Sequence, residues 1–126
     1  MPPRFNDDQL DAEVLFLLKQ HRGRQSPIGR WEMVAKLYGP QACEPRTDDN
    51  VADRQVRESI ARLRRQGVLV CDMGDGKGRF LASTLEEYGA FKAYFGAAAF
   101  EKIEIIREMD KAAAQEFPNE LQPRLL

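Results

Sequence analysis

The sequence predicts a mostly helical α+β protein with one short β-hairpin and a long helical extension near the C-terminus. Apolar residues recur at helical spacing in four segments, and one β-branched apolar run is followed by a glycine-rich turn and a short return strand. A chain of 126 residues has room for one compact domain with an appended element. Hydrophobic residues make up 43% and charged residues 31%, which is typical of a folding chain with a heavily charged surface.

Composition excludes several classes of protein. No apolar run approaches the roughly 18 residues of a membrane-spanning helix, so we expect no membrane partner. The N-terminus has no apolar segment of the secretory type, which favours a cytoplasmic protein. Two cysteines are too few for a disulfide framework, and a single histidine leaves few metal ligands, so we expect neither a metal nor a cofactor.

The charges are unevenly distributed along the chain, although the formal net charge is only -1. Residues 54–79 hold seven basic and three acidic side chains, whereas residues 86–120 hold eight acidic and four basic ones. This division predicts polyanion contact through the first segment and a solvated or partner-facing surface in the second.

The first helix is expected to follow a flexible tail over residues 1–6, which contain two prolines and little to bury. Asp7 or Asp8 is its expected N-cap, and one apolar stripe continues to His21 before Gly23 ends the helix.

A second short helix is expected from about residue 28 to residue 38, where a Gly-Pro pair ends it. Residues 40–52 show neither helical nor strand periodicity, so we expect a long loop there, with at most one helical turn near residues 41–44.

The third helix is predicted over residues 54–66, with Asp53 as N-cap and Gly67 as C-cap. Its apolar stripe is Val56, Ile60 and Leu63. The opposite side and its flanks are mostly arginine: Arg54, Arg57, Arg62, Arg64 and Arg65.

A hairpin is predicted over residues 68–82, with a glycine-rich turn at 74–78. Thr84 and Glu87 have the spacing of a capping box, which opens a helical extension over residues 84–116. Residues 117–126, with two prolines, are expected to form a flexible tail.

The order helix, helix, arginine-faced helix, hairpin is that of a winged helix-turn-helix domain, which we place at residues 7–83. The segment DRQVRESIARLRRQGV over residues 53–68 resembles the recognition helix and first wing strand of small phage and prophage winged-helix proteins. GRFLASTLEE over residues 78–87 is similar to the segment that follows in those proteins. The resemblance implies DNA binding in transcriptional or replication control.

The loop over residues 40–52 departs from that pattern. It has thirteen residues, whereas roughly three or four usually join the two helices. It also places net negative charge beside the predicted DNA-facing helix, so we expect this loop either to move aside or to contact a partner.

Eight residues are predicted to contact duplex DNA. Arg54, Gln55 and Glu58 would approach base edges in the major groove. Arg57, Arg62 and Arg65 would meet phosphates, and Lys77 and Arg79 in the wing would reach a neighbouring phosphate or the minor groove. The alternative is that the third helix simply has a solvated charged face.

The apolar stripe of the last helix is longer than a small core can cover, because about 30 helical residues span about 45 Å. We therefore expect a homodimer. Its contacts would be Phe91, Phe95, Ile103, Ile106 and Met109. The alternative is that the helix folds back over its own domain.

The leading functional hypothesis is non-catalytic binding of double-stranded DNA. The main alternative is a winged-helix module that binds proteins through its acidic loop and last helix. An enzyme using the glycine-rich turn is disfavoured, because that turn lacks the ending of a P-loop and no serine or cysteine has a nucleophile context. Cys71 is expected to be packed in a strand, whereas Cys43 is expected to be exposed in the loop.

Overall fold

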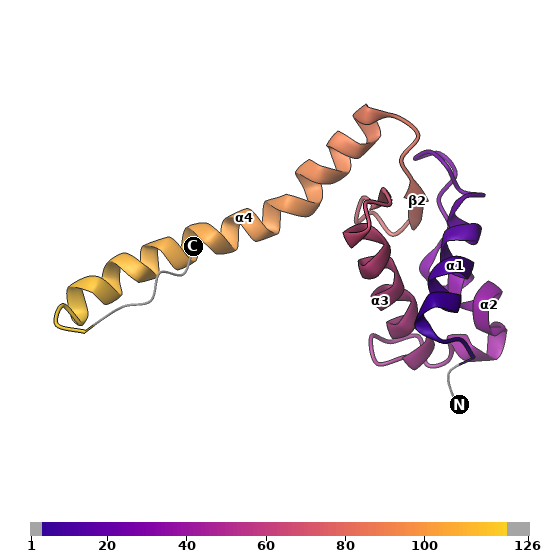
Figure 1. Ribbon diagram of the computed structural model, residues 1–126, viewed down its shortest axis with the longest axis horizontal. Coiled ribbons are helices and arrows are strands. Elements are labelled where there is room, and N and C mark those ends of the chain that lie inside the picture. Colours follow the sequence, from indigo (N-terminus) through magenta and orange to yellow (C-terminus); the bar gives the residue numbers. More distant parts are fainter. Residues whose placement is uncertain (1–3, 121–126) are drawn as a thin grey trace. The chain divides into compact units, whose positions relative to one another are not determined.

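The computed structural model describes residues 4–120 and confirms a mostly helical α+β class with a two-stranded antiparallel sheet and a long C-terminal helix (Figure 1). In chain order the elements are α1 (Asp7–Leu18), α2 (Arg30–Tyr38), the 3₁₀ helix η1 (Pro40–Cys43), α3 (Val51–Arg65), β1 (Val70–Asp72), β2 (Arg79–Leu81) and α4 (Leu85–Glu116). The chain divides into two compact units, Met1–Phe91 and Lys92–Leu126. Within the described residues no helix combines the length and apolar character that crossing a bilayer requires.

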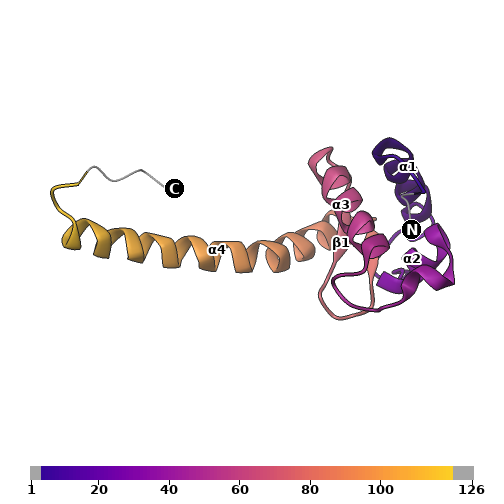
Figure 2. The ribbon, with the colours of Figure 1, turned by 90° about the horizontal axis from the view of Figure 1, so that it is seen from below.

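The core of the first unit lies between α1, α2 and α3, which Figure 2 shows next to one another. Each helix contributes a buried stripe at helical spacing, and the side chains that fill the centre come from all three helices. They include Val14 and Leu18 from α1, Met33 and Val34 from α2, and Val56, Ile60 and Leu63 from α3. The predicted stripe of the third helix is therefore confirmed as a core face.

The first helix begins at Asp7, earlier than an N-cap at Asp7 or Asp8 would allow, and it ends before the predicted His21. Asn6 is the N-cap: its side-chain oxygen accepts a hydrogen bond from the Gln9 amide at 2.8 Å, and the Asn6 amide donates one to the side-chain oxygen of Gln9 at 3.0 Å. Asp7 and Asp8 instead lie in the first turn, and the helix ends at Leu18.

The predicted flexible tail is wrong for residues 4–6, and residues 1–3 lie outside the described part of the chain. An Nη atom of Arg4 donates to the carbonyl of Leu37 at 3.3 Å. The rings of Phe5 and Tyr38 meet edge to face with their centroids 5.5 Å apart. These contacts attach the N-terminal segment to α2.

The predicted N-cap of the third helix, Asp53, is also wrong. Asn50 caps α3 instead, with its side-chain oxygen accepting from the Asp53 amide at 2.9 Å. The Asn50 amide group also donates to the carbonyls of Ala42 and Pro45, each at 2.9 Å. One buried asparagine thus fixes both the start of α3 and the preceding loop, and the expected loop over residues 40–52 is shortened by η1 and by the first turn of α3.

The hairpin is shorter than predicted and pairs Val70 with Leu81, Cys71 with Phe80 and Asp72 with Arg79. The outer edge of β2 also bridges to the segment between α1 and α2, where Ile28 and Arg79 exchange backbone hydrogen bonds of 2.8 and 2.9 Å. The hairpin is therefore tied to the α1–α2 connection as well as to α3.

The start of α4 belongs to the first unit. Phe91 is buried against Cys71 and Phe80, so it is not available for the predicted dimer contact. Thr84 caps the helix by accepting from the Glu87 amide at 3.1 Å. The Glu87 carboxylate does not complete the capping box at Thr84, because it accepts from the amides of Arg24 and Ser83 instead, at 3.0 and 2.8 Å. These backbone donors lower the pKa of Glu87.

Both cysteines are buried thiols. Cys71 is fully buried as predicted, and burial raises its pKa. The expectation of an exposed Cys43 is wrong, because its side chain is 3% exposed and donates to the carbonyl of Trp31 at 3.3 Å.

Replacement by alanine should lower the free energy of unfolding by different amounts at two glycines of the hairpin. At Gly78, with φ +118°, an added Cβ would overlap the carbonyl of Ile28, whereas at Gly76, with φ +79°, nothing lies within 4 Å. We expect Gly78→Ala to lower the free energy of unfolding by at least about 3 kcal/mol, because strain and overlap add. Gly76→Ala should lower it by only about 1 kcal/mol. Urea unfolding measures both, and equal losses would contradict the close approach of backbone at Gly78.

Candidate nucleic-acid interface

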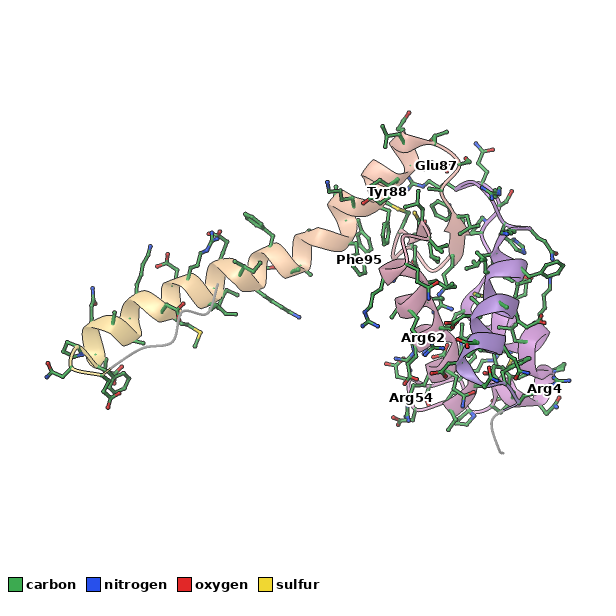
Figure 3. The ribbon with its side chains drawn as sticks, in the orientation of Figure 1. Arg4, Arg54, Arg62, Glu87, Tyr88 and Phe95 are labelled. Carbon is green, nitrogen blue, oxygen red and sulfur yellow. The ribbon has the colours of Figure 1, made fainter. Side chains whose placement is uncertain are left out.

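The exposed face of α3 carries two of the predicted arginines. Arg54 and Arg65 are exposed, and eleven residues of helix separate them by about 16 Å along the axis while returning them to nearly the same direction. Among residues 4–120, neither guanidinium takes part in a hydrogen bond or an ion pair. Glu58 is exposed between them, and the half-buried Ala61 leaves this face flat toward the C-terminal end. Figure 3 labels Arg54 near the start of α3 and Arg62 further along it.

A buried carboxylate organises the start of this face. The Asp53 side chain is 0% exposed and receives hydrogen bonds from Arg30 at 2.9 and 2.6 Å and from Arg57 at 3.0 Å. Arg30 lies at the first position of α2, so Asp53 joins two helices. Arg30 also donates to the Asp48 carboxylate at 2.8 Å, and Arg57 donates to the Asp48 carbonyl at 2.8 Å. The acidic loop is thus attached to both arginines.

Burial and ionic contacts act on the Asp53 pKa in opposite directions. Burial alone would raise it, but the hydrogen bonds and charges of Arg30 and Arg57 outweigh burial and hold it below the ordinary value. The same contacts, first with Asp53 and then with Asp48, raise the pKa of Arg30. Asp53 is therefore a permanent carboxylate near neutral pH.

A shallow groove of about 310 Å³ runs between α3, the start of α2 and the hairpin turn. Its lining combines three guanidinium groups, two carboxylates and turn glycines: Arg30, Arg57, Arg79, Asp48, Asp72, Gly74, Gly76 and Gly78. Arg30 and Arg57 retain partly exposed side chains at 35% and 42%. Arginine carries five N–H donors in a planar fork, so these two can bind an anion while keeping Asp53.

Arg62 does not lie on the open face. Its guanidinium donates to Asp11 of α1 at 2.8 to 3.1 Å, and the Ser59 hydroxyl donates to the same carboxylate at 2.6 Å. The hydrogen bond from Arg62, assisted by that from Ser59, outweighs burial and lowers the pKa of Asp11. The predicted phosphate contact of Arg62 is therefore corrected, because this side chain joins α1 to α3.

Arg79 is also withdrawn from the surface. The residue is 9% exposed, and its guanidinium contacts the Met33 sulfur at 3.5 Å. Burial lowers its pKa, and nearby Asp53 and Asp72 oppose that shift. A wing contact with DNA through Arg79 is not available in this conformation, whereas Lys77 at the turn is exposed.

Gln55 is half-buried, and its side-chain oxygen accepts from the Tyr38 hydroxyl at 2.7 Å. The remaining arginine of the helix, Arg64, donates to the Val70 carbonyl at 3.0 Å and lies over the Phe91 ring at 5.0 Å. Sequence spacing places these residues on a helix, but it does not distinguish arginines with partners from arginines without them.

Arg30 is a residue of this candidate interface that the sequence did not predict. It lies outside the basic segment 54–79, and only the packing of α2 against α3 brings it to Asp53 and the groove. The guanidinium groups of Arg30 and Arg46 also lie over the Trp31 ring, at 4.8 and 5.9 Å from its centroid. No local sequence pattern around Arg30 predicts this cluster.

Comparison of the chain with protein-family models, curated proteins and solved structures finds no significant match. Across residues 4–120, no group of three or more histidine, cysteine or carboxylate side chains is arranged to hold a metal ion.

We expect Asp53→Asn to lower the free energy of unfolding by about 3 kcal/mol, because it leaves two arginines facing a neutral group in a buried site. Asp49→Asn, in the exposed part of the same loop, should change it by less than about 0.5 kcal/mol. Chemical unfolding at neutral pH measures both, and equal effects would contradict the structural role of Asp53.

Acid should weaken the fold through the same carboxylates. The folded structure lowers the pKa values of Asp53 and Asp11. Their contribution to the free energy of unfolding is therefore complete above the pKa of the unfolded chain, about 3.9, and is lost as the pH falls through the lower pKa values of the folded state. Unfolding measured from pH 7 down to acid should therefore show a shallower pH dependence in Asp53→Asn than in the unaltered chain. Parallel profiles would contradict this.

Arg62 and Arg65 should differ in their effects on stability. Arg62→Ala should lower the free energy of unfolding by about 1–2 kcal/mol, because Asp11 loses a charged hydrogen-bond partner. Arg65→Ala should change it by less than about 0.5 kcal/mol. Thermal unfolding followed by circular dichroism makes the comparison, and a larger loss for Arg65→Ala would show that the two roles are reversed.

Proposed function

We propose that residues 7–83 form a winged helix-turn-helix domain that binds double-stranded DNA without catalysis, as a small regulator of transcription or replication of the phage type. The arrangement of α1, α2, α3 and the hairpin supports this proposal, and so does the pairing of β2 with the α1–α2 connection. In this reading α3 is the recognition helix and the hairpin is the wing.

The exposed pair Arg54 and Arg65 carries the proposal. An α-helix fits the major groove of B-DNA, which is about 12 Å wide, and two arginines about 16 Å apart on one face can reach opposite sides of it. Arg54 lies in the N-terminal half of α3, from which base edges are usually read, and Arg65 lies at the end, where phosphates are met. Neither side chain has a partner among residues 4–120 that it must release before it binds.

The groove beside α3 extends the proposed contact to a neighbouring phosphate. Arg30 and Arg57 are held in place by Asp53, so their remaining N–H donors are positioned in advance of binding. Lys77 adds a positive charge at the hairpin turn. Asp48 and Asp72 reduce the local positive charge, so the strongest attraction lies along Arg54, Arg57 and Arg65.

A second candidate function is protein docking beside the acidic loop. A cavity of about 280 Å³ lies between the end of α2, the loop and the start of α3. Val51 at its edge is 58% exposed, and Glu44 and Asp49 give it negative charge. This surface favours a partner whose side chain combines an apolar stem with a basic end group.

We expect the chain to bind mixed-sequence duplex DNA with an affinity that falls steeply with salt, because phosphate contacts release counterions. Arg65→Ala should reduce the slope of log affinity against log salt by about one. Arg54→Ala should weaken binding by about tenfold or more if Arg54 contacts a base edge. Fluorescence anisotropy of a labelled duplex over a salt series measures both quantities.

Arg107→Ala is the matched control, because Arg107 is an exposed arginine that pairs with Glu104 in the acidic second unit. It should change neither affinity nor slope. Absence of binding at low salt by a folded chain would overturn DNA binding and favour protein docking. An equal loss for Arg65→Ala and Arg107→Ala would show that only the net charge of the chain matters.

A further inference from the structure

The second unit presents an apolar helix face to solvent. Residues 92–116 continue α4, and three large side chains on one side of it are about half exposed or more: Tyr94 at 50%, Ile105 at 53% and Met109 at 65%. At about 100° per residue these three point within roughly 60° of one another. The glutamates of this stretch lie mainly on the adjoining side.

A seven-residue repeat runs through this face. Positions separated alternately by four and three residues are Phe95, Ala98, Lys102, Ile105, Met109, Ala112 and Glu116. This spacing is that of the a and d positions of a coiled coil, in which each side chain packs against a second helix of the same period. A repeat of this kind indicates a helical partner rather than a flat protein surface.

We propose that this face pairs with the same face of a second copy of the chain in antiparallel orientation. With Lys102 opposite Ile105, the same alignment sets Ala98 against Met109 and Phe95 against Ala112, so every large side chain meets a smaller or flexible one. Two-fold symmetry repeats each pairing. A parallel in-register pair would instead oppose Phe95 with Phe95 and Ala98 with Ala98. Two large side chains would then meet in one layer of the interface and two small ones in the next.

The charge of Lys102 supports the antiparallel orientation. A parallel in-register pair brings the two Lys102 ammonium groups face to face, where they repel. In the antiparallel pair Lys102 meets Ile105 of the second copy, and Glu101 and Glu108 lie one turn to either side of that residue on the rim. The single cation on the face thus gains two opposite charges.

The face is long enough for a specific interface. From Phe95 to Ala112, the outermost positions paired in this alignment, the helix extends over about 26 Å. A helix pair in contact over this length buries on the order of 1,000 Å², at the lower end for specific protein interfaces.

Of the predicted dimer residues, Phe95 and Met109 belong to the repeat, and Ile106 lies beside it. Ile103 points away from it, and Ile105 was missed.

Sedimentation equilibrium of the full chain without DNA tests the pairing, so the result does not depend on the proposed function. We expect a dimer at micromolar concentration. Ile105→Asp should weaken self-association by at least about a hundredfold, because apolar burial is lost in both copies. Phe100→Asp is the matched control, since Phe100 is 63% exposed but lies on the far side of the helix.

A chain that is monomeric while circular dichroism shows intact helix would overturn the proposal. Equal dissociation by Ile105→Asp and Phe100→Asp would also overturn the assigned face.

Cysteine crosslinking tests the orientation. The double variant Ala98→Cys with Met109→Cys should form disulfide-linked dimers under mild oxidation, because these positions meet in the antiparallel pair. Ala98→Cys alone should not, because its two copies lie about 16 Å apart along the axis. Efficient crosslinking of the single variant would establish a parallel pair and overturn the antiparallel arrangement. The unaltered chain is the control for Cys43 and Cys71, which are buried.

Discussion

The buried carboxylate of Asp53 is the contact on which the arrangement of the first unit depends. A carboxylate transferred from water to a protein interior loses several kcal/mol of hydration, and only well-placed donors offset that loss. Arg30 from α2 and Arg57 from α3 supply these donors, and both also bind Asp48 of the loop. One charge therefore sets the position of two helices and the connection between them.

This contact divides the arginines of the chain into two kinds. Some have carboxylate, carbonyl or sulfur partners and define the fold, as Arg62 does with Asp11 and Arg64 does with Val70. Others, such as Arg54 and Arg65, extend from α3 without partners within the described residues. A basic segment of +4 is thus mostly structural, and the surface it leaves for a polyanion is narrower than the count of charges implies.

Periodicity predicted the elements well, because each helix buries a stripe that is visible in the sequence. Val56, Ile60 and Leu63 were recognised in this way, and so was the hairpin. Contacts distant in sequence were not predictable. Asp53 has the local features of an N-cap, yet Asn50 takes that role because it can also satisfy the Ala42 and Pro45 carbonyls. Likewise, spacing marked Arg62 as exposed, and only the packing of α1 reveals Asp11 opposite it.

The two buried thiols provide internal reporters of local opening. A thiol reacts with an alkylating reagent only when solvent reaches it, so the labelling rate of each cysteine follows the opening of its surroundings. Cys43 lies at the end of η1, in the acidic loop, and contacts Trp31, and Cys71 lies in β1 of the hairpin and packs with Phe80 and Phe91. The chain thus carries, without added probes, one chemical sensor for release of the loop and a second for lifting of the hairpin.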